Sequence, residues 1–332
     1  MSVESATARQ PPPGTATRNE QKWERIIRPK PQLHVPPTLI EFDPARPSSM
    51  FDGIRRHEHA FDGLRALERG KLTKAPNRKA KRVSGGVNGT LPVVRATDRH
   101  TNVSVRAVLK SVAAGGAQER FAYEFGAALG MDHLLPRVGR RSNGTAAIEL
   151  VRGSTFRTSG IRNAQTLEKA LRHSWGVQFP DMSSPEVRRR ARIDRQLIQL
   201  YDYLLANGDR HGSNGMFDAR SGRLTLIDQG LINRYDPAQA NGLFPRVRMD
   251  FQGGDGVQLL KRSSKMRLEP EVLALVRGTD RTRVESAFQQ MMRDVNGAKS
   301  VGSYGRKPTP AFLDQIMTRL DDVARTGIIR VH

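Results

Sequence analysis

The chain has 332 residues, a formal net charge of +22, 37% hydrophobic residues and 6% aromatic residues. It has no cysteine, which excludes disulfides and thiolate metal sites, and no apolar run long enough to cross a bilayer. The excess of basic residues favours an acidic partner such as nucleic acid, an anionic membrane or a phosphate-bearing ligand, unless it only reflects the Arg-rich composition. Because the first residues, MSVESATARQPPPGTATRNEQ, lack the apolar core of a signal peptide, we expect a soluble protein.

Residues 1–82 are predicted to be a disordered, basic N-terminal region with a secretion or docking role. Residues 1–48 are rich in Pro, Ser, Thr and Arg and contain the breakers QPPPG and HVPP. The echo of FDGIR in FDGLR within residues 51–72 indicates a plain surface helix, with an amphipathic helix or a partner-docking segment as the alternatives. The run KAPNRKAKR is typical of a solvated basic linker, although it could also contact phosphates or acidic lipid. The folded domain is expected to begin near Val83.

Residues 83–155 are predicted to form a small β-rich lobe that carries one helix. Apolar and polar residues alternate in TLPVVRA and VSVRAVLKSV, which is typical of half-buried strands. The segment AQERFAYEFGAALGM has apolar residues at helical spacing, and Gly130 is expected to end that helix. A third strand is predicted at TAAIELV.

Residues 156–332 are predicted to form a helical lobe with a small β insert. Leucines and Tyr201 line one broad face of DRQLIQLYDYLLAN, and PEVLALV, TRVESAFQQMMRDV and PAFLDQIMTRLDDVART are amphipathic at the period of a helix. Between them, RLTLIDQGL predicts a short strand. The sequence therefore predicts an α+β fold with two lobes, the first rich in strands and the second rich in helices.

Three polar residues stand out between Tyr201 and Gly230, in YDYLLANGDRHGSNGMFDARSGRLTLIDQG: Asp209, Asn214 and Asp228. Phosphoryl transfer needs a carboxylate to orient the attacking hydroxyl and accept its proton, and Mg²⁺ prefers oxygen ligands beside the nucleotide phosphates. Asp209 fits the first role, whereas Asn214 and Asp228 fit the second. Each residue alone would suit a polar turn, but their order and spacing are those of protein kinases.

The segment NGDRHGSNGMFD…GRLTLIDQG resembles the DRHxxN…IDxG signature of the phosphatidylinositol 3- and 4-kinase-like group. That group of atypical kinases includes actin-fragmin kinase and, more loosely, HipA-type kinases. The resemblance runs from Val83 to about Arg325, is strongest over residues 202–231, and implies a bilobal protein-kinase-like fold that uses ATP and Mg²⁺. Gln229 departs from the usual Asp-Phe-Gly or Asp-His-Gly triplet, which puts the usual hydrophobic packing at that position in doubt.

The resemblance assigns roles to the residues of the loop. Asp209 becomes the catalytic aspartate, and Asn214 and Asp228 become the metal ligands. Arg210 and His211 shape the loop, and the most that is expected of His211 beyond this is an electrostatic aid to the transferring phosphate. A zinc site is not expected at His211, because no other histidine lies at a zinc-like spacing and cysteine is absent.

The resemblance also points to a nucleotide site upstream. The Gly-rich segment SGGVNGT lies where these families carry their phosphate loop, so its backbone N–H groups would approach the phosphates. The residues expected to bind nucleotide there are Gly85, Gly86, Val87, Asn88, Gly89 and Thr90. Lys110, in RAVLKSV, resembles the lysine that holds the α- and β-phosphates, and its apolar neighbours indicate a partly buried stem. The alternative for SGGVNGT is a plain hairpin turn, and the alternative for Lys110 is an exposed surface lysine.

An acidic residue on the following helix is expected to pair with Lys110. Glu119 is preferred because QERFAYEFGAALGM…LP resembles the corresponding helix of the related families, and Glu124 is the alternative. The strand IELVRG resembles the hinge, so backbone groups of Leu150 and Val151 are expected to bind adenine.

The leading functional hypothesis is an ATP- and Mg²⁺-dependent kinase that phosphorylates a hydroxyl group of a protein substrate. A phosphoinositide kinase and a kinase-fold nucleotidyl transferase are the enzymatic alternatives, and the first would use anionic lipid. A basic protein that binds nucleic acid or a membrane is the non-enzymatic alternative, but only net charge favours it, so nucleic acid is not the expected partner. The Arg- and Ala-rich composition is typical of bacteria, and the polar N-terminus is similar to that of type III effectors. This similarity favours a host protein as substrate and the host cytoplasm, or otherwise the bacterial cytoplasm, as location.

Overall fold

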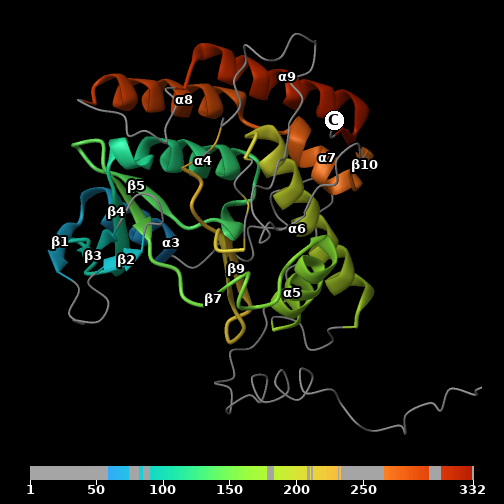
Figure 1. The fold of residues 1–332 in the computed structure, drawn as a ribbon, viewed down its shortest axis with the longest axis horizontal. Coiled ribbons are helices and arrows are strands. Elements are labelled where there is room, and N and C mark those ends of the chain that lie inside the picture. The colour runs from blue at the N-terminus through green and yellow to red at the C-terminus, as the bar shows by residue number, and fades with distance from the viewer. Residues whose placement is uncertain are drawn as a thin grey trace, which may run out of the picture. The chain divides into compact units, whose positions relative to one another are not determined.

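An antiparallel sheet forms the first part of the fold (Figure 1). The computed structural model describes residues 59–74, 82–84, 90–177, 183–207, 210, 212–230, 232, 265–298 and 308–330. The strands of this sheet are β1 (Lys71–Lys74), β2 (Arg82–Ser84), β3 (Thr90–Thr97), β4 (Ser104–Lys110), β5 (Val138–Arg140) and β6 (Ala146–Glu149). Their order is β1-β3-β4-β6-β5, and β2 also pairs with β3. Strand β4 is therefore central, with β3 on one side and β6 on the other.

Helix α3 (His59–Arg69) places the start of the described fold before Val83, earlier than the sequence analysis expected. Its Ala66 and Leu67 are fully buried. They share one apolar cluster with four residues of the sheet: Ala96, Val105, Ala107 and Ala147. The expectation of a surface helix is wrong for this face, because the helix covers strand residues that would otherwise meet water. Residues 1–58 lie outside the described residues.

Helices dominate the second part of the fold. The further helices are α4 (Gly116–Ala128), α5 (Ala164–Gly176), α6 (Pro185–Leu204), α7 (Pro270–Arg277), α8 (Arg281–Asn296) and α9 (Pro310–Thr326). A three-stranded sheet contains β7 (Ser154–Thr155), β8 (Gly215–Asp218) and β9 (Arg223–Leu226), and β10 (Lys265–Arg267) pairs with β11 (Ile328–Arg330). Short 3₁₀ turns cover Val112–Ala114 and Asp132–Leu134. The predicted α+β fold, with strands first and helices later, is confirmed.

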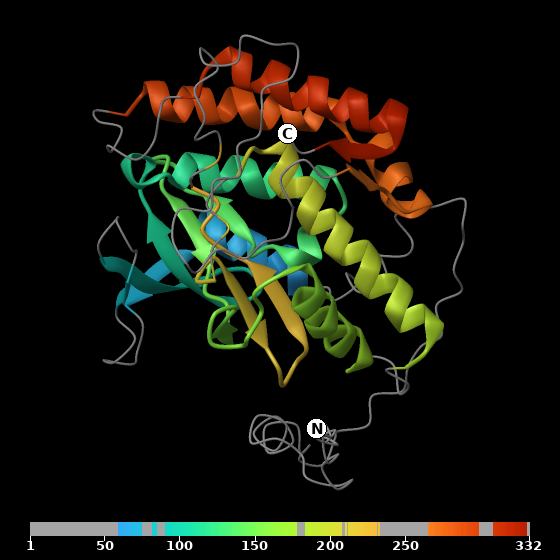
Figure 2. The ribbon, with the colours of Figure 1, turned by 45° about the vertical axis from the view of Figure 1, so that its right-hand side comes forward.

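Helix α4 lies beside the sheet and is covered by the C-terminal helices, as Figures 1 and 2 show. The ring of Phe121 on α4 packs edge-on against Phe288 of α8, with 5.6 Å between ring centroids. Its distance to the ring of Phe312 on α9 is 6.3 Å. Phe125 lies 6.1 Å from Tyr201 of α6. Because these rings are buried, aromatic packing fixes α4 from the side opposite the sheet.

Local sequence signals set the helix ends. Asn163 caps α5 in a capping box, in which its side chain accepts from the backbone N–H of Thr166. Ser184 caps α6 and Asp280 caps α8, each side chain accepting one backbone N–H of the first turn. Gly130 has a φ of 76°, a left-handed conformation that suits glycine, and it ends α4 where the sequence predicted a stop.

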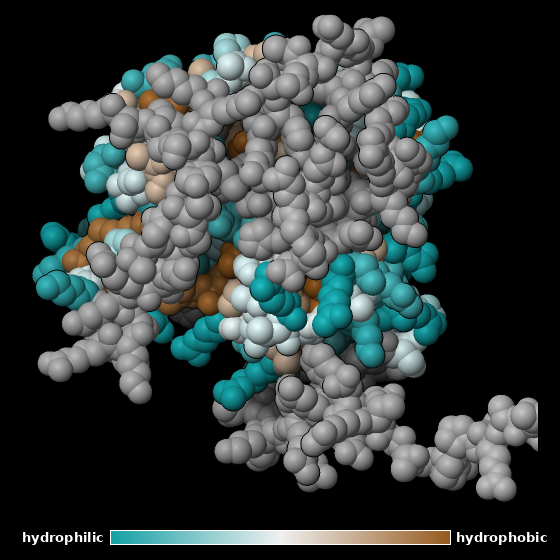
Figure 3. Space-filling model, viewed as in Figure 1, coloured by the Kyte–Doolittle hydropathy of each residue, from teal (hydrophilic) through white to brown (hydrophobic). Residues whose placement is uncertain are grey.

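Figure 3 shows hydrophilic residues along much of the edge of the face in view and groups of hydrophobic residues nearer its centre. Among the described residues, Val177 is the one large hydrophobic side chain classed as exposed. None of the described helices combines the length and the apolar character that a membrane span needs.

Glu149, at the end of β6, joins the six-stranded sheet to the β8–β9 hairpin. It accepts hydrogen bonds from Nε of Arg137 at 3.0 Å and from Nη1 of Arg223 at 2.9 Å. Burial alone would raise the pKa of Glu149, but the hydrogen bonds and charges of Arg223 and Arg137 lower it from 4.5 to about 2. The ionised carboxylate is therefore stabilised in the folded state.

Replacing Glu149 with glutamine is expected to destabilise the protein by about 2 kcal/mol at neutral pH, since the partner arginines are partly exposed and screened. Because the folded-state pKa is depressed, the contribution is complete above pH 4.5 and is lost as the pH falls towards 2. Urea unfolding of both proteins between pH 7 and pH 3 should therefore show a shrinking difference. Asp321→Asn, which breaks an exposed ion pair with Arg281, serves as the control and should show little difference at any pH. If the difference in unfolding free energy between wild type and Glu149→Gln stayed constant with pH, it would contradict the lowered pKa of Glu149.

Candidate functional site

Lys110 is the centre of a buried ionic cluster that joins three separate segments. It lies at the end of β4 and is only 3% exposed. Its Nζ donates to Oε1 of Glu119 on α4 at 2.7 Å and to Oδ1 of Asp228, after β9, at 2.7 Å. Since Asp228 is 118 residues further along the chain, this cluster depends on the tertiary fold. The three residues are called the Lys110 cluster below.

The local backbone brings Glu119 to Lys110. Helix α4 begins soon after β4 ends, and Glu119 lies in its first turn, where the helix dipole favours a carboxylate. Gly116 permits this tight connection, because a Cβ there would lie 2.2 Å from the backbone oxygen of Lys110. Glu124, the alternative partner, lies elsewhere on the helix and accepts from Arg120 and Arg283.

Charge complementarity governs the Lys110 cluster. Burial alone would lower the pKa of Lys110, but the carboxylates of Glu119 and Asp228 outweigh it and raise that pKa above its usual value. Burial raises the pKa of Glu119, whereas the ammonium of Lys110 opposes this change. Lys110 therefore stays protonated at neutral pH, and a fixed positive charge lies between an enclosed and a more open carboxylate.

Asp228 and Asn214 are neighbours at the open end of the β8–β9 hairpin. The backbone N–H of Ile227 donates to the backbone oxygen of Asn214 at 3.1 Å, one step beyond the pairing of Gly215 with Leu226. The side chain of Asp228 is 40% exposed, so one of its faces is open to solvent or ions. The hairpin thus makes the backbones of the two residues predicted as metal ligands neighbours, with Asn214 3% exposed.

A divalent cation fits this pair by donor chemistry. Mg²⁺ takes oxygen ligands and is held by one or two protein groups together with substrate phosphates, as a carboxylate and an amide could provide here. No group of three or more His, Cys, Asp and Glu side chains within the described part of the chain is arranged to hold a metal ion. A site completed by phosphates is consistent with both observations.

Backbone geometry around Asp228 is unusual. Asp228 has a φ of 56°, in the left-handed region that residues other than glycine rarely adopt. Two residues later, a Cβ on Gly230 would lie 2.9 Å from Nζ of Lys110. The chain after β9 therefore passes so close to Lys110 that only glycine fits at position 230 without displacing the lysine.

A second buried cluster lies directly behind Asp228, and we call it the Arg210 cluster. Its members are Asp202, Asn207, Arg210 and Gln229, each 2% exposed or less. Arg210 donates from Nε and Nη2 to the two carboxylate oxygens of Asp202, at 3.1 and 2.9 Å. It also donates to the backbone oxygen of Asn214, which ties it to the hairpin. The role of Arg210 as a loop-shaping residue was predicted, but Asp202 and Asn207 were not identified from the sequence.

A sequence signal for Asp202 was available. It lies within the apolar run of α6, where a charged residue is expected to be paired if it is buried. Asn207 follows two residues after the helix cap Leu205, and its backbone N–H donates to the backbone oxygen of Asp202 at 2.9 Å. Its side chain donates to Oδ1 of Asp202 at 3.1 Å.

An apolar patch lies on the side of the sheet that carries Lys110. Val108 precedes Lys110 by two residues, so both side chains leave β4 on the same side. Val93 lies opposite Val108 on β3. These two buried valines form one cluster with the partly buried Leu91 and Leu150. The sequence analysis did not identify this patch, which depends on strand pairing.

The remaining predicted site residues have different outcomes. The N–H of Leu150 donates to the backbone oxygen of Arg106 at 2.8 Å, so in this structure it is already engaged rather than free for adenine. Val151 follows β6 and is partly buried. Thr90 begins β3. Several predicted residues lie outside the described residues: Gly85, Gly86, Val87, Asn88, Gly89, Asp209 and His211.

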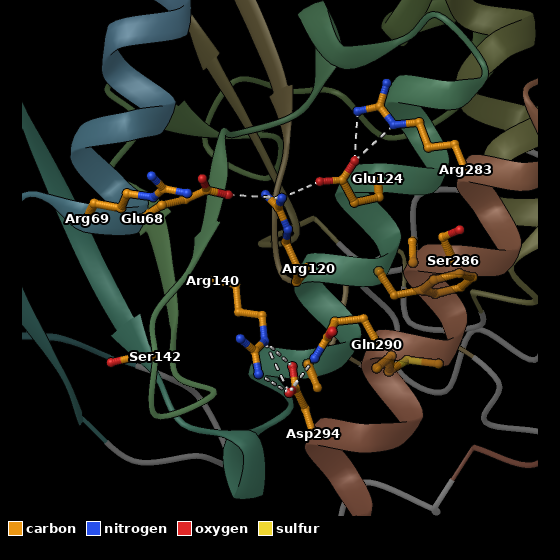
Figure 4. A pocket seen from close by; sticks show the side chains of 14 residues that line it. Glu68, Arg69, Arg120, Glu124, Arg140, Ser142, Arg283, Ser286, Gln290 and Asp294 are labelled. Atoms are coloured by element: carbon orange, nitrogen blue, oxygen red, sulfur yellow. Dashed lines mark hydrogen bonds and ion pairs between the residues drawn. The ribbon is translucent and has the colours of Figure 1, made fainter.

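A cavity of about 550 Å³ lies beside α4, but the Lys110 cluster does not line it. Figure 4 shows Arg120 between Glu68 of α3 and Glu124, with Arg283 of α8 on the far side of Glu124. Elsewhere in the cavity, Arg140 pairs with Asp294. These ion pairs connect α3, α4 and α8, so the cavity wall helps to hold α4.

Comparison with known proteins gives one distant structural similarity. No protein-family model matches the chain, and no curated protein sequence matches it. Among solved structures, the chain is similar to the proinflammatory kinase CtkA of Helicobacter pylori, with a TM-score of 0.39 and 13% sequence identity. The match covers 79% of this chain and 94% of that chain. The function proposed below therefore depends on the geometry of the Lys110 cluster.

Proposed function

We propose that the protein is an ATP- and Mg²⁺-dependent phosphotransferase that phosphorylates a hydroxyl group of a protein substrate. The observation that carries this proposal is the bridge from Lys110 to Glu119 and Asp228, with 2.7 Å on each side. A lysine fixed between a helix glutamate and an aspartate near the metal position is the arrangement that kinases use to hold nucleotide phosphates.

The nucleotide would lie along β3 and β4. Lys110 holds the α- and β-phosphates, because its charge is fixed and its amine binds Asp228, whose side chain is 40% exposed. The apolar patch formed by Val93, Val108 and Leu150 supports the adenine ring, with Val151 as the backbone partner. The family resemblance assigns the glycines of residues 85–89, which lie outside the described residues, to the phosphates.

The metal position is formed by Asp228 and Asn214. When bound there, Mg²⁺ neutralises charge on the phosphates during transfer. Asp228 supplies a carboxylate oxygen and Asn214 an uncharged amide oxygen. Asp209 orients the acceptor hydroxyl and takes its proton, as its place in the loop before Asn214 suggests.

The test is transfer of label from ATP carrying radioactive phosphate in either the α or the γ position. Wild type should transfer only the γ label, and a protein acceptor should be labelled in preference to phosphoinositide vesicles. Asp209→Ala and Lys110→Met should each abolish transfer. Transfer of the α label would instead support nucleotidyl chemistry, and labelled lipid alone would support a lipid kinase. Absence of any transfer together with absence of nucleotide binding would overturn the proposal.

Two glutamates of α4 form a matched pair for a sharper test. Glu119→Gln is expected to lower kcat/KM for ATP about 100-fold, because Lys110 loses the carboxylate that fixes its position. Glu124→Gln should keep kcat/KM within about threefold, since Glu124 pairs with Arg120 and Arg283 away from the Lys110 cluster. Steady-state kinetics measures kcat/KM for ATP in both variants. Equal losses of kcat/KM would contradict a specific role for Glu119.

A further inference from the structure

Gln229 stands between the Lys110 cluster and the Arg210 cluster. Its side-chain Oε1 accepts from Nη2 of Arg210 at 2.8 Å and from Nδ2 of Asn207 at 3.1 Å. Its Nε2 donates to the backbone oxygen of Ile227 at 3.1 Å. Its backbone N–H donates to Oε2 of Glu119 at 2.9 Å. Gln229 therefore makes four hydrogen bonds while it is 2% exposed.

An amide is the group that these neighbours require. Arg210 and Asn207 both present donors to the same point, so an acceptor must lie there, and Ile227 presents an acceptor, so a donor must lie beside it. An apolar side chain of similar size would leave the donors of Arg210 and Asn207 buried without that acceptor, which is costly in a low-dielectric interior. The polar residue is thus matched to its surroundings, in place of the hydrophobic packing expected at this position.

The backbone of Gln229 has a separate consequence for Asp228. Asp228 keeps its left-handed φ of 56° only if the residues around it over-determine that conformation. Gln229 supplies bonds on both sides of it: its side chain holds the backbone of Ile227, and its own N–H is held by Glu119. Because Glu119 also accepts from Lys110, the position of Gln229 affects both carboxylates of the Lys110 cluster.

We propose that Gln229 is a positioning residue. It links Arg210, in the loop before Asn214, to the orientation of Asp228 and Glu119. The inference rests on the proposed phosphotransferase function and adds a residue outside the phosphate and metal contacts. Gln229 acts through its neighbours: it fixes the carboxylate of Asp228 towards Lys110 and towards the metal position. Substitution of Gln229 should therefore lower kcat and the Mg²⁺-linked gain in nucleotide affinity more than it lowers nucleotide affinity without Mg²⁺.

The experiment compares two substitutions of Gln229 with a matched buried glutamine. Gln229→Leu removes the acceptor and the donor. Gln229→Glu keeps the acceptor for Arg210 and Asn207, loses the donor to Ile227 and adds a buried negative charge beside Arg210. Gln118→Leu on α4 is the control, because Gln118 is similarly buried, at 3% exposed, and its Oε1 has no hydrogen-bond partner among the described residues. Each full-length variant is measured for kcat, for KM, for urea unfolding, and for the affinity of a fluorescent ATP analogue with and without Mg²⁺.

Gln229→Leu is expected to lower kcat about 100-fold, with a smaller change in KM, and to remove most of the gain in nucleotide affinity that Mg²⁺ gives. Affinity without Mg²⁺ should stay within about threefold of wild type, because Lys110 is retained. Gln229→Glu should fall between wild type and Gln229→Leu both in kcat and in the gain in nucleotide affinity that Mg²⁺ gives. Gln118→Leu should match wild type in both.

The outcomes separate this inference from the proposed function. If wild type transfers phosphate but Gln229→Leu keeps the kcat and the Mg²⁺-linked affinity gain of Gln118→Leu, the positioning role is wrong and the function stands. If Gln229→Leu does not fold, the test uses Gln229→Glu. A Gln229→Glu protein with the kcat and the Mg²⁺-linked affinity gain of wild type would overturn the positioning role. If wild type shows neither transfer nor Mg²⁺-dependent nucleotide binding, the function fails and the inference fails with it.

Discussion

Asp228→Asn is expected to lower kcat for phosphate transfer about 1,000-fold, a loss of roughly 4 kcal/mol of transition-state stabilisation. Asparagine keeps the shape of the side chain but removes the negative charge that binds Lys110 at 2.7 Å and that would hold the metal. Steady-state kinetics at saturating ATP and Mg²⁺ measures the effect. The loss should appear mainly in kcat, because the charge matters most while phosphate charge is redistributed.

A control for this substitution lies on the same hairpin. Asp218 ends β8 at the turn, where its carboxylate accepts from the backbone N–H of Arg220 and from the hydroxyl of Ser221. Asp218→Asn should therefore leave kcat within about twofold, since it can disturb only the turn. A similar loss in both variants would show that the hairpin as a whole, and not the carboxylate of Asp228, is sensitive.

Asp202→Ala is expected to lower the free energy of unfolding by about 3–5 kcal/mol, because it leaves the guanidinium of Arg210 buried without its counter-charge. Both side chains of this ion pair are fully buried. Urea unfolding followed by far-ultraviolet circular dichroism measures the change, and a failure to fold at all agrees with the upper end of the range. Asp202→Asn also removes the counter-charge, but its amide oxygen can still accept a hydrogen bond from Arg210, so it should lose less than Asp202→Ala.

An exposed ion pair on the same helix provides the comparison. Glu186 binds Arg190 one turn away near the start of α6, and its side chain is 50% exposed. Glu186→Ala should change the free energy of unfolding by less than about 1 kcal/mol. An unfolding midpoint for Asp202→Ala equal to that of Glu186→Ala would contradict the account of the Arg210 cluster.

Periodicity predicted the elements that carry the site. The apolar spacing of α4 and α6 and the alternation in β3, β4 and β6 depend on local sequence, and the structure has these elements where they were expected. Gly130 ended α4 as predicted. The meeting of Lys110 with Glu119 was expected from a family resemblance, since spacing alone left Glu124 open. The assignment of lobes to residues 83–155 and 156–332 stays a prediction.

Features that depend on tertiary contacts were not predictable from local sequence. Helix α3 looked like a surface segment because its few apolar residues, such as Leu67, gave no indication of the strands they cover. The Arg210 cluster joins residues up to 27 positions apart, from Asp202 to Gln229, and its hydrogen bonds to Gln229 form only when the hairpin folds back. Gln229 departs from the usual triplet of the resembled family, and the sequence could not show the polar partners that surround it in the structure.

The most direct test of the Lys110 cluster is a crystal structure of the protein with a non-hydrolysable ATP analogue and Mn²⁺ in place of Mg²⁺. We predict an anomalous peak within bonding distance of Asp228 and Asn214, with Nζ of Lys110 on the α- or β-phosphate and the adenine ring beside Val93 and Val108. Nucleotide bound elsewhere, for example in the cavity beside Arg120, with Lys110 still closed on Glu119 and Asp228, would contradict the account.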